Sequence, residues 1–274
     1  MDGLRICFLG TGSMGSAVLS GLVSAGHPKE LISATTKSTA SAATLRELGV
    51  SAMALEEAAD ANALMAGDAD LIVLGVKPYQ IAGLLDEIRD EIGRNAVVIS
   101  MAAGIALETM AERLPEHPNL IRTMPNTPAL VGKGVTGLSA AASCGKDAVS
   151  AAVALFGSVG EVIEIPEHKI NALSAISGSG PAWVYYFIEQ WEAIAEAEGF
   201  SKEQAQLMVR GTFDGAIELL ASSALEPEQL RRNVTSPGGT TERIIATLDD
   251  ANLQGIFQKA LSAAVARAEE IARS

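Results

Sequence analysis

A glycine-rich hexapeptide near the start of the chain has the residue types of a dinucleotide-binding turn. GTGSMG at 10–15 follows an apolar run and opens a stretch whose apolar residues have helical spacing. In such a strand–turn–helix unit the first glycine permits the tight turn, the second lets backbone amides approach a pyrophosphate, and the third lets helix and strand pack closely. An ordinary glycine-rich turn is the alternative. The position between strand and helix favours a cofactor site formed by Gly10, Thr11, Gly12, Ser13, Met14 and Gly15.

About twenty residues further on, the chain carries a cation where an enzyme specific for NAD carries an acid. The segment Thr35-Thr36-Lys37-Ser38 follows the second apolar run. A carboxylate here would hold the ribose 2′-hydroxyl of NAD and repel the 2′-phosphate of NADP. A lysine flanked by hydroxyls suits that phosphate, so Thr36, Lys37 and Ser38 are predicted to favour NADP. A polar loop whose lysine binds nothing is the alternative.

Two further turns follow apolar runs and are expected at the same edge of a sheet. Val76, Lys77 and Pro78 follow the run Leu71–Gly75 at the edge where α/β folds bind ligands, although Pro78 also suits a plain helix start. Ser100–Gly104 follows the next run, and its small side chains would let a nicotinamide lie against the backbone. The residues expected to contact the cofactor are Val76, Lys77, Pro78, Met101, Ala102 and Ala103.

Two segments of the second half have the composition of a site for a carboxylate. Ser177–Pro181 and Thr235–Thr241 each combine hydroxyls, glycines and one proline at a predicted helix start, where unpaired backbone amides converge. Helix capping with tight helix crossing explains the first segment equally well. The second has four hydroxyls where a cap needs one, so it is the stronger candidate for substrate binding.

No side chain has the setting of a strong acid or base. The three histidines, His27, His117 and His168, lie beside helix caps, prolines or charged turns, where a solvated surface position is expected. Oxidation of an alcohol needs a base to remove the hydroxyl proton, whereas a protonated imine is already electrophilic and needs mainly positioning. A site built of hydroxyls and amides therefore fits reduction of a C=N bond better than that of a C=O bond.

Alternating elements must position these turns. The runs predicted as strands, in a mostly parallel sheet with crossover helices, are Leu4–Leu9, Leu31–Thr35, Leu71–Gly75, Val97–Ser100, Asn119–Thr123, Val135–Ser139 and Glu161–Ile165. The first helix is predicted over Ser13–Ala25, with Gly26 as its cap. After Pro166 only helices are predicted, at 167–177, 180–198, 201–224, 226–233, 239–248 and 251–272. The prediction is an α/β Rossmann-type dinucleotide-binding domain at 1–165, followed by an all-α dimerisation domain at 166–274.

The dimerisation prediction depends on one aromatic helix. Trp183, Tyr185, Tyr186, Phe187 and Trp191 lie close together, and Ala182–Ile188 is apolar on every face. Such a helix must be covered all round, by its own domain or by a second subunit. We favour a subunit interface, and a core helix of a monomer is the alternative.

The composition excludes several classes of protein. The 274-residue chain has a formal net charge of −13, which argues against a nucleic-acid partner, because phosphate binding needs clustered Lys and Arg. Cys7 and Cys144 lie far apart, and Cys7 sits in an apolar run, so we expect a reducing compartment and no metal site. The N-terminus lacks the pattern of a cleavable signal and no apolar run reaches spanning length, so we expect a cytoplasmic protein without a membrane partner.

Five segments together give the sequence a family resemblance across essentially the whole chain: GTGSMG at 10–15, VKP at 76–78, RTMPNTPALVGKGVTGL at 122–138, SGSGPA at 177–182 and NVTSPGGTT at 233–241. They resemble the pyrroline-5-carboxylate reductases. The last segment is the most specific, since related dehydrogenases share the first but not this loop. The resemblance implies NADPH-dependent reduction of the cyclic imine 1-pyrroline-5-carboxylate to L-proline, the closing step of proline biosynthesis. It also implies a homodimer with interlocked helical domains, in which each site takes residues from both chains, and dimers that can assemble further.

The resemblance also implies roles for residues that the patterns above do not single out. Asn62 joins the cofactor site, Thr241 hydrogen-bonds the ring nitrogen, and Glu167 is another substrate-side position. The substrate carboxylate is received by Asn233 and by backbone amides of the loop, at Ser236, Gly238, Gly239 and Thr240. The chain departs from the family pattern at Lys37, where Arg is usual, at Asn171 and Ser174, where Asp and Thr are usual, and at Trp183, where Tyr is usual.

Two other functions fit parts of the chain. A β-hydroxyacid dehydrogenase shares the N-terminal glycine pattern but requires a catalytic lysine on the interdomain helix. The corresponding segment, 178–198, contains no lysine. A non-catalytic NADP-binding sensor would leave the loop Thr235–Thr241 without a purpose.

Overall fold

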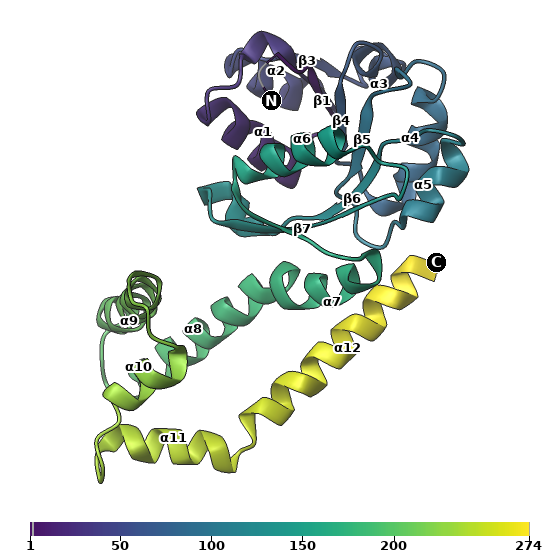
Figure 1. Ribbon diagram of the computed structural model, residues 1–274. Coiled ribbons are helices and arrows are strands. Elements are labelled where there is room, and N and C mark those ends of the chain that lie inside the picture. The colour runs from purple at the N-terminus through teal and green to yellow at the C-terminus, as the bar shows by residue number, and fades with distance from the viewer. Residues whose placement is uncertain (2, 274) are drawn as a thin grey trace. The chain divides into compact units, whose positions relative to one another are not determined.

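One sheet of eight strands forms the first part of the chain in the computed structural model, which describes residue 1 and residues 3–273 (Figure 1). The strand order is β3-β2-β1-β4-β5-β6-β7-β8, and all neighbours are parallel except β6 and β7. The strands are β1 Ile6–Leu9, β2 Ile32–Thr36, β3 Ser51–Ala54, β4 Leu71–Leu74, β5 Val97–Ser100, β6 Leu120–Met124, β7 Gly134–Ala140 and β8 Gly160–Glu164. The chain reverses its winding between β1 and β4, so the carboxyl ends of these two strands flank the position where such sheets bind ligands.

Every predicted strand is present within one or two residues of its expected bounds, but β3 was not predicted. Its sequence, Ser-Ala-Met-Ala, has neither the β-branched nor the aromatic residues that usually mark a strand. Pairing with β2, from Ser33↔Ser51 to Thr36↔Ala54, and burial of Ala52 and Ala54 define it instead. The mostly parallel sheet is confirmed.

Helices cover both faces of this sheet. Helices α1 (Ser13–Ser24), α2 (Thr39–Glu47) and α6 (Lys146–Gly157) lie on one face, and α3 (Ala61–Ala66), α4 (Ile81–Ile88) and α5 (Leu107–Arg113) lie on the other (Figure 1). Short 3₁₀ turns join them at η1 Lys29–Leu31, η2 Pro78–Gln80, η3 Thr127–Val131 and η4 Glu167–Lys169. The first helix ends as predicted, because Gly26 adopts a φ of +89° and its amide bonds to Val23 O.

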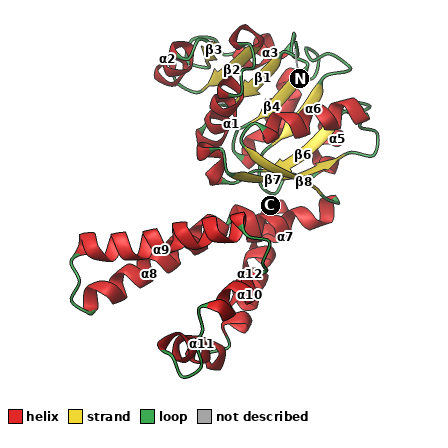
Figure 2. Cartoon of the chain, turned by 60° about the vertical axis from the view of Figure 1, so that its left-hand side comes forward, coloured by secondary structure: helices red, strands yellow, loops and turns green. Residues whose placement is uncertain are grey.

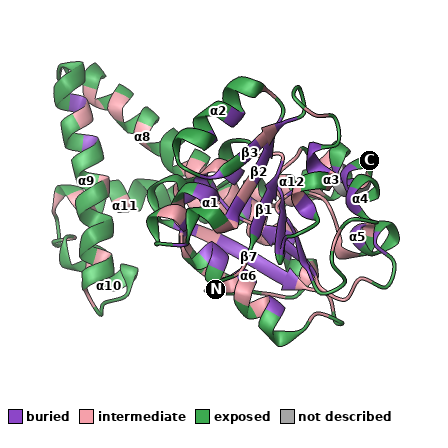
Figure 3. Ribbon diagram, turned by 90° about the horizontal axis from the view of Figure 1, so that it is seen from above, coloured by how far each residue is buried: buried purple, intermediate pink, exposed green. Residues whose placement is uncertain are grey.

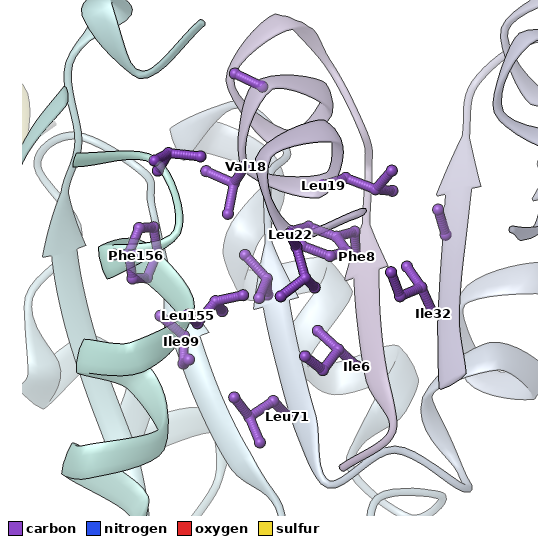
Figure 4. Packing of buried hydrophobic residues seen from close by; sticks show 14 of the residues in the cluster. Ile6, Phe8, Val18, Leu19, Leu22, Ile32, Leu71, Ile99, Leu155 and Phe156 are labelled. Atoms are coloured by element: carbon purple, nitrogen blue, oxygen red, sulfur yellow. The ribbon is translucent and has the colours of Figure 1, made fainter. Parts of the chain in front are cut away.

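The two-residue periodicity of β1 divides the core in two. Ile6 and Phe8 point to the face of α1 and α6, whereas Cys7 and Leu9 point to the opposite face. Figure 4 shows Leu22 of α1 beside Phe8, with Leu155 and Phe156 of α6 over neighbouring strands. The strands that carry the cofactor turns are therefore held on both sides by packed side chains.

Two residues singled out in the sequence lie in or near this core. Burial raises the pKa of the Cys7 thiol to about 12, despite a hydrogen bond with Ser33 that lowers it. His27 is buried, and its Nε2 lies 2.9 Å from Leu4 O, to which it donates, so the expected solvated position is wrong for this histidine. Packing of the loop after α1 against the start of β1 encloses the ring. His117 is half-buried and bonds to Ala96 O, and His168 is exposed.

After β8 the described residues form helices and connecting turns (Figure 2). The elements are α7 Ile170–Leu173, a π-helical turn η5 Ser174–Gly178, α8 Gly180–Ala197, α9 Lys202–Ser222, α10 Pro227–Asn233, α11 Thr240–Asp250 and α12 Leu253–Arg273. The predicted helical second half is confirmed. The one difference is at 167–177, where a 3₁₀ turn, a short α-helix and a π turn replace a continuous helix.

Contacts divide the chain into two compact units, one of Met1–Ser179 with the end of the chain from Ala264, and one of Gly180–Ala263. The second unit has little core of its own, because only Ala205 and Val209 among its described residues are buried apolar side chains. Figure 3 shows buried residues along the strands and mostly exposed residues along α8 and α9. Tyr185 and Tyr186 of α8 are 64% and 59% exposed, an apolar surface of the kind that a partner covers. Across the described residues, no helix has the length and apolar character needed to cross a bilayer.

Candidate active site

The glycine-rich turn leaves space at the start of α1. A Cβ built on Gly12 would meet no atom within 4 Å, and no side chain caps the helix there. The first amides of the helix therefore have no partner within it, and the space beside Gly12 is open. This opening and the helix dipole suit the pyrophosphate of a dinucleotide.

The tight approach in this turn occurs at Gly10. Its φ is +76°, and a Cβ there would lie 2.1 Å from Cγ1 of Val76. Gly15 was expected to allow close packing of helix and strand, but a Cβ at Gly15 would lie 3.4 Å from the nearest atom, in Thr11, which is ordinary contact. Only glycine thus fits at position 10, whereas the protein itself leaves room for a methyl group at position 15.

A buried polar network fixes the turn to two other elements. The amide of Gly10 donates to the hydroxyl of Thr35 at 2.9 Å, and this hydroxyl donates to Oδ1 of Asn62 at 2.7 Å. Nδ2 of Asn62 donates to Glu87 at 3.1 Å. Asn62, on α3, is therefore joined to the glycine-rich turn through the end of β2, although its own amide is buried.

The loop after β2 contains the predicted NADP-selective residues. Thr36 donates its hydroxyl to Ser38 O at 2.9 Å, and the Ser38 hydroxyl caps α2 by accepting from the amide of Ser41. Lys37 is exposed between them. The hydroxyls of Thr36 and Ser38 thus form hydrogen bonds that shape the start of α2. The exposed Lys37 is the cation that this loop offers to a ligand.

The turns after β4 and β5 meet the glycine-rich turn. A Cβ on Gly75 would lie 2.8 Å from Gly10 O, and Cε of Met101 lies within 4 Å of the Cβ positions built on Gly15 and Gly75. The Ser100 hydroxyl accepts from the amide of Ala102 at 3.2 Å and turns the chain after β5. Val76, Lys77 and Pro78 follow β4 at the same edge, and Pro78 begins η2. The structure therefore brings the predicted cofactor residues of three strand ends together.

A cavity of about 260 Å³ adjoins the turn after β5, and its lining includes Ala103, Gly104, Arg122 and Asn171. Arg122 is 6% exposed, and its guanidinium donates to Glu167 at 3.2 Å and to Asn171 at 3.1 Å. The same Glu167 oxygen accepts from the amide of Leu107, the first residue of α5, at 2.7 Å. Glu167, predicted on the substrate side, thus also ties α5 to β6. Arg122 lies inside a motif that carried the family resemblance, but no pattern in the sequence indicates this role.

Two of the quoted motifs are joined by Asn126. Its Nδ2 donates to Ser177 O at 3.0 Å and its Oδ1 accepts from the amide of Val135 at 2.8 Å. The start of SGSGPA is therefore held against β7, close to the cavity that Ser174 and Ser179 also line.

The loop Thr235–Thr241 belongs to the unit Gly180–Ala263 and precedes α11. No side chain caps this helix, whose first residues are Thr240 and Thr241. The amide of Gly239 bonds to Ser236 O at 2.9 Å, and the amide of Gly238 donates to the carboxylate of Glu242 at 2.8 Å. Asn233, at the end of α10, accepts from Gln229 at 2.9 Å. One backbone amide of the predicted carboxylate site thus already binds a carboxylate of the chain itself.

The described residues contain no group of three or more His, Cys, Asp or Glu side chains able to hold a metal ion.

Comparison with known proteins extends over the whole chain. A family model described as pyrroline-5-carboxylate reductase dimerisation matches residues 167–271, and one described as NADP oxidoreductase, coenzyme F420-dependent, matches residues 5–104. A pyrroline-5-carboxylate reductase of Vibrio alginolyticus is 38% identical over 99% of this chain and 98% of its own length.

Solved structures give the same result. A pyrroline-5-carboxylate reductase of Coxiella burnetii superposes with a TM-score of 0.91 and 35% identity, covering 98% of this chain and 99% of that one. A pyrroline carboxylate reductase of Plasmodium falciparum, solved with NADP bound, has a TM-score of 0.86 at 27% identity, covering 99% of both chains. The likeness therefore includes both the sheet and the helical half.

Proposed function

The chain belongs to the pyrroline-5-carboxylate reductase family, and from this premise we propose how its residues carry out the NADPH-dependent reduction of 1-pyrroline-5-carboxylate to L-proline. It is an oxidoreductase of proline biosynthesis that uses NADP as its cofactor. The main support for this function is that the likeness to named reductases spans both halves of the chain. The glycine-rich turn at 10–15 and the loop Thr235–Thr241 therefore occur together, as in those reductases.

The cofactor lies along the carboxyl edge of the sheet. The open space at Gly12 and the uncapped start of α1 fit its pyrophosphate, held by the segment from Gly10 to Gly15. Thr36, Lys37 and Ser38 would bind the adenosine ribose and its 2′-phosphate, and Asn62 would support the turn. The residues that would hold the nicotinamide end are Val76, Lys77, Pro78, Met101, Ala102 and Ala103. When bound, NADPH supplies the hydride that the imine carbon accepts.

The loop Thr235–Thr241 holds the substrate carboxylate. Amides of Ser236, Gly238, Gly239 and Thr240 receive it together with Asn233, because amides at a helix start favour an anion. The amide of Gly238 donates to Glu242 and that of Gly239 to Ser236 O, so the substrate carboxylate would take the place of these two acceptors. Glu167 is a further substrate-side residue, and Arg122 and the amide of Leu107 hold its carboxylate.

Thr241 orients the ring nitrogen through its hydroxyl and is the residue in direct contact with the reacting bond. A protonated imine needs no strong acid, so positioning by a hydroxyl suffices. The absence of a histidine from the predicted substrate loop agrees with this mechanism.

The assembly is a homodimer, and dimers can associate further. The dimerisation match at 167–271 and the exposed aromatic residues of α8 support an interface formed by the helical half. The cofactor domain is 1–165, and the dimerisation and substrate domain is 166–274. We place the protein in the cytoplasm, a reducing compartment that supplies NADPH and suits the free thiols of Cys7 and Cys144.

One comparison of substrates tests this function. NADPH and NADH consumption is measured with 1-pyrroline-5-carboxylate, with its six-membered piperidine homologue, and with NADP and a β-hydroxyacid in the reverse direction. The proposal expects the five-membered imine to be reduced fastest. Oxidation of the hydroxyacid alone would favour a β-hydroxyacid dehydrogenase, and binding of NADPH without turnover of any of them would favour a sensor.

A further inference from the structure

The unpredicted strand β3 brings a second loop to the adenosine end of the cofactor site. Its last residue, Ala54, pairs with Thr36, the last residue of β2, and the amide of Leu55 donates to Thr36 O at 2.9 Å. Residues that follow β3 therefore lie beside the loop that carries Lys37. In sheets of this kind, residues at the end of β2 bind the adenosine ribose of a dinucleotide.

Glu56, directly after Leu55, places a carboxylate in this position. It accepts from the amide of Thr39 at 3.0 Å and from the Thr39 hydroxyl at 3.4 Å. Thr39 is the first residue of α2 and lies two residues after Lys37. The Glu56 carboxylate thus uses a backbone amide at the loop where a 2′-phosphate would be received.

The neighbouring Glu57 behaves differently. It forms an ion pair with Arg46 and accepts from the amide of Ala54 at 2.9 Å, and the hydrogen bond from Arg46 lowers the pKa of its carboxyl. Its charge is matched by a cation. Within the described residues, both hydrogen bonds of Glu56 come from Thr39, a neutral residue, so the charge of Glu56 can act on a ligand bound at the loop.

We propose that Glu56 is a specificity-determining residue of the nucleotide site, which opposes the 2′-phosphate of NADP and suits the ribose 2′-hydroxyl of NAD. The inference rests on the proposed function, in which the dinucleotide lies along this edge of the sheet. Lys37 attracts the 2′-phosphate, and Glu56 repels it and competes for the amide of Thr39. The chain therefore prefers NADP less strongly than Lys37 alone would require, and it also accepts NADH.

The physical argument depends on the difference between the two cofactors. A phosphate monoester carries a charge between −1 and −2 near neutral pH, so its binding must overcome repulsion by Glu56 or displace this side chain. A 2′-hydroxyl carries no charge and can donate a hydrogen bond to the carboxylate, as it does to the acid that follows β2 in NAD enzymes. Loss of the Glu56 charge should therefore strengthen the binding of NADP⁺ but not that of NAD⁺.

The test compares Glu56→Gln with Glu47→Gln, which removes the same charge from the last residue of α2, the opposite end of the helix. Dissociation constants for NADP⁺ and NAD⁺ are measured by titration calorimetry without any imine, on the full chain. Glu56→Gln should lower the Kd for NADP⁺ about three- to tenfold, as expected when one charge beside a phosphate is removed, and leave that for NAD⁺ unchanged or higher. Glu47→Gln should change neither by more than about twofold, because solvent and salt screen distant charges.

Equal changes for both cofactors in Glu56→Gln, or changes no larger than in Glu47→Gln, would overturn the proposal. Because Glu56 is exposed, the variant should fold, and an unchanged melting temperature verifies this. Failure of the wild-type chain to bind either dinucleotide would overturn the proposed function along with this inference. Binding that Glu56→Gln does not redistribute would overturn this inference alone.

Discussion

The hydroxyl of Thr35 donates to Oδ1 of Asn62 at 2.7 Å and at the same time accepts from the amide of Gly10 at 2.9 Å. Thr35 is completely buried, so water cannot take the place of its hydroxyl as the hydrogen-bond partner of Gly10 and Asn62. One side chain at the end of β2 thus connects the glycine-rich turn with α3.

Thr35→Val should weaken both folding and cofactor binding. The isosteric change leaves the half-buried Gly10 amide and the buried carboxamide oxygen of Asn62 without their partner, and loss of a buried partner costs about 1–3 kcal/mol. We expect a lower free energy of unfolding in urea and a higher Kd for NADP⁺. Thr35→Ser keeps the hydroxyl and serves as the control, and a valine variant as stable and as tight-binding as the serine variant would contradict the role of the network.

Alanine at the first two glycines of the turn should separate folding from binding. Gly10→Ala meets a left-handed backbone and Cγ1 of Val76 at 2.1 Å, so it should lower the free energy of unfolding by about 2–4 kcal/mol. Gly12→Ala places its methyl group in open space at a φ of −90°, so stability should change by less than about 0.5 kcal/mol. Its Kd for NADP⁺ should nevertheless rise at least about tenfold, because the methyl group intrudes where the pyrophosphate binds. Thermal melting and calorimetry measure the two effects, and an unaltered Kd in Gly12→Ala would place the pyrophosphate elsewhere.

The sequence predicts the parts of the site that depend on local pattern. The glycine-rich turn and the loop Thr235–Thr241 are recognisable because glycines, prolines and residues with hydroxyl groups occur at fixed offsets from periodic apolar runs. β3 has no such pattern: four small or flexible residues become a strand only because β2 offers a partner. Glu56 could not be assigned to the nucleotide site without that strand.

Contacts between distant residues are the other part that the sequence does not contain. Arg122 and Glu167 are 45 residues apart and meet because β6 and η4 pack together. His27 was expected in solvent, since a local pattern cannot tell that the loop after α1 folds back onto Leu4. The family resemblance supplied Asn62, whose neighbour Thr35 lies 27 residues earlier in the chain.

Thr241→Ala should lower kcat for the imine by about ten- to a thousandfold, the range for loss of one contact that positions or polarises the reacting bond. The Kd for NADP⁺ should not change. Thr247→Ala is the matched control, because this threonine lies on the same helix and its exposed hydroxyl bonds only to Arg243 O in the described part of the chain. Unchanged turnover in Thr241→Ala would remove the proposed role.

The buried thiol of Cys7 makes stability depend on alkaline pH. Its pKa is about 12 in the folded chain against an ordinary 9.0, so above pH 9 the unfolded chain loses a proton that the folded chain keeps. The stabilising contribution is complete below pH 9 and falls by up to about 1.4 kcal/mol per pH unit up to pH 12. Urea unfolding of the wild type and of Cys7→Ala at pH 8 and pH 10.5 measures the difference between the two chains. This difference should shrink at the higher pH, and a constant difference would show that the thiol does not ionise on unfolding.

Transfer of a labelled hydride tests the central claim most directly. The enzyme is given 1-pyrroline-5-carboxylate with NADPH deuterated at C4, in each of its two diastereomers separately, and the product is examined by NMR. We predict L-proline with deuterium at C5 from one of the diastereomers and unlabelled L-proline from the other. Consumption of neither, or proline without deuterium from both, would contradict direct reduction of the imine by this protein.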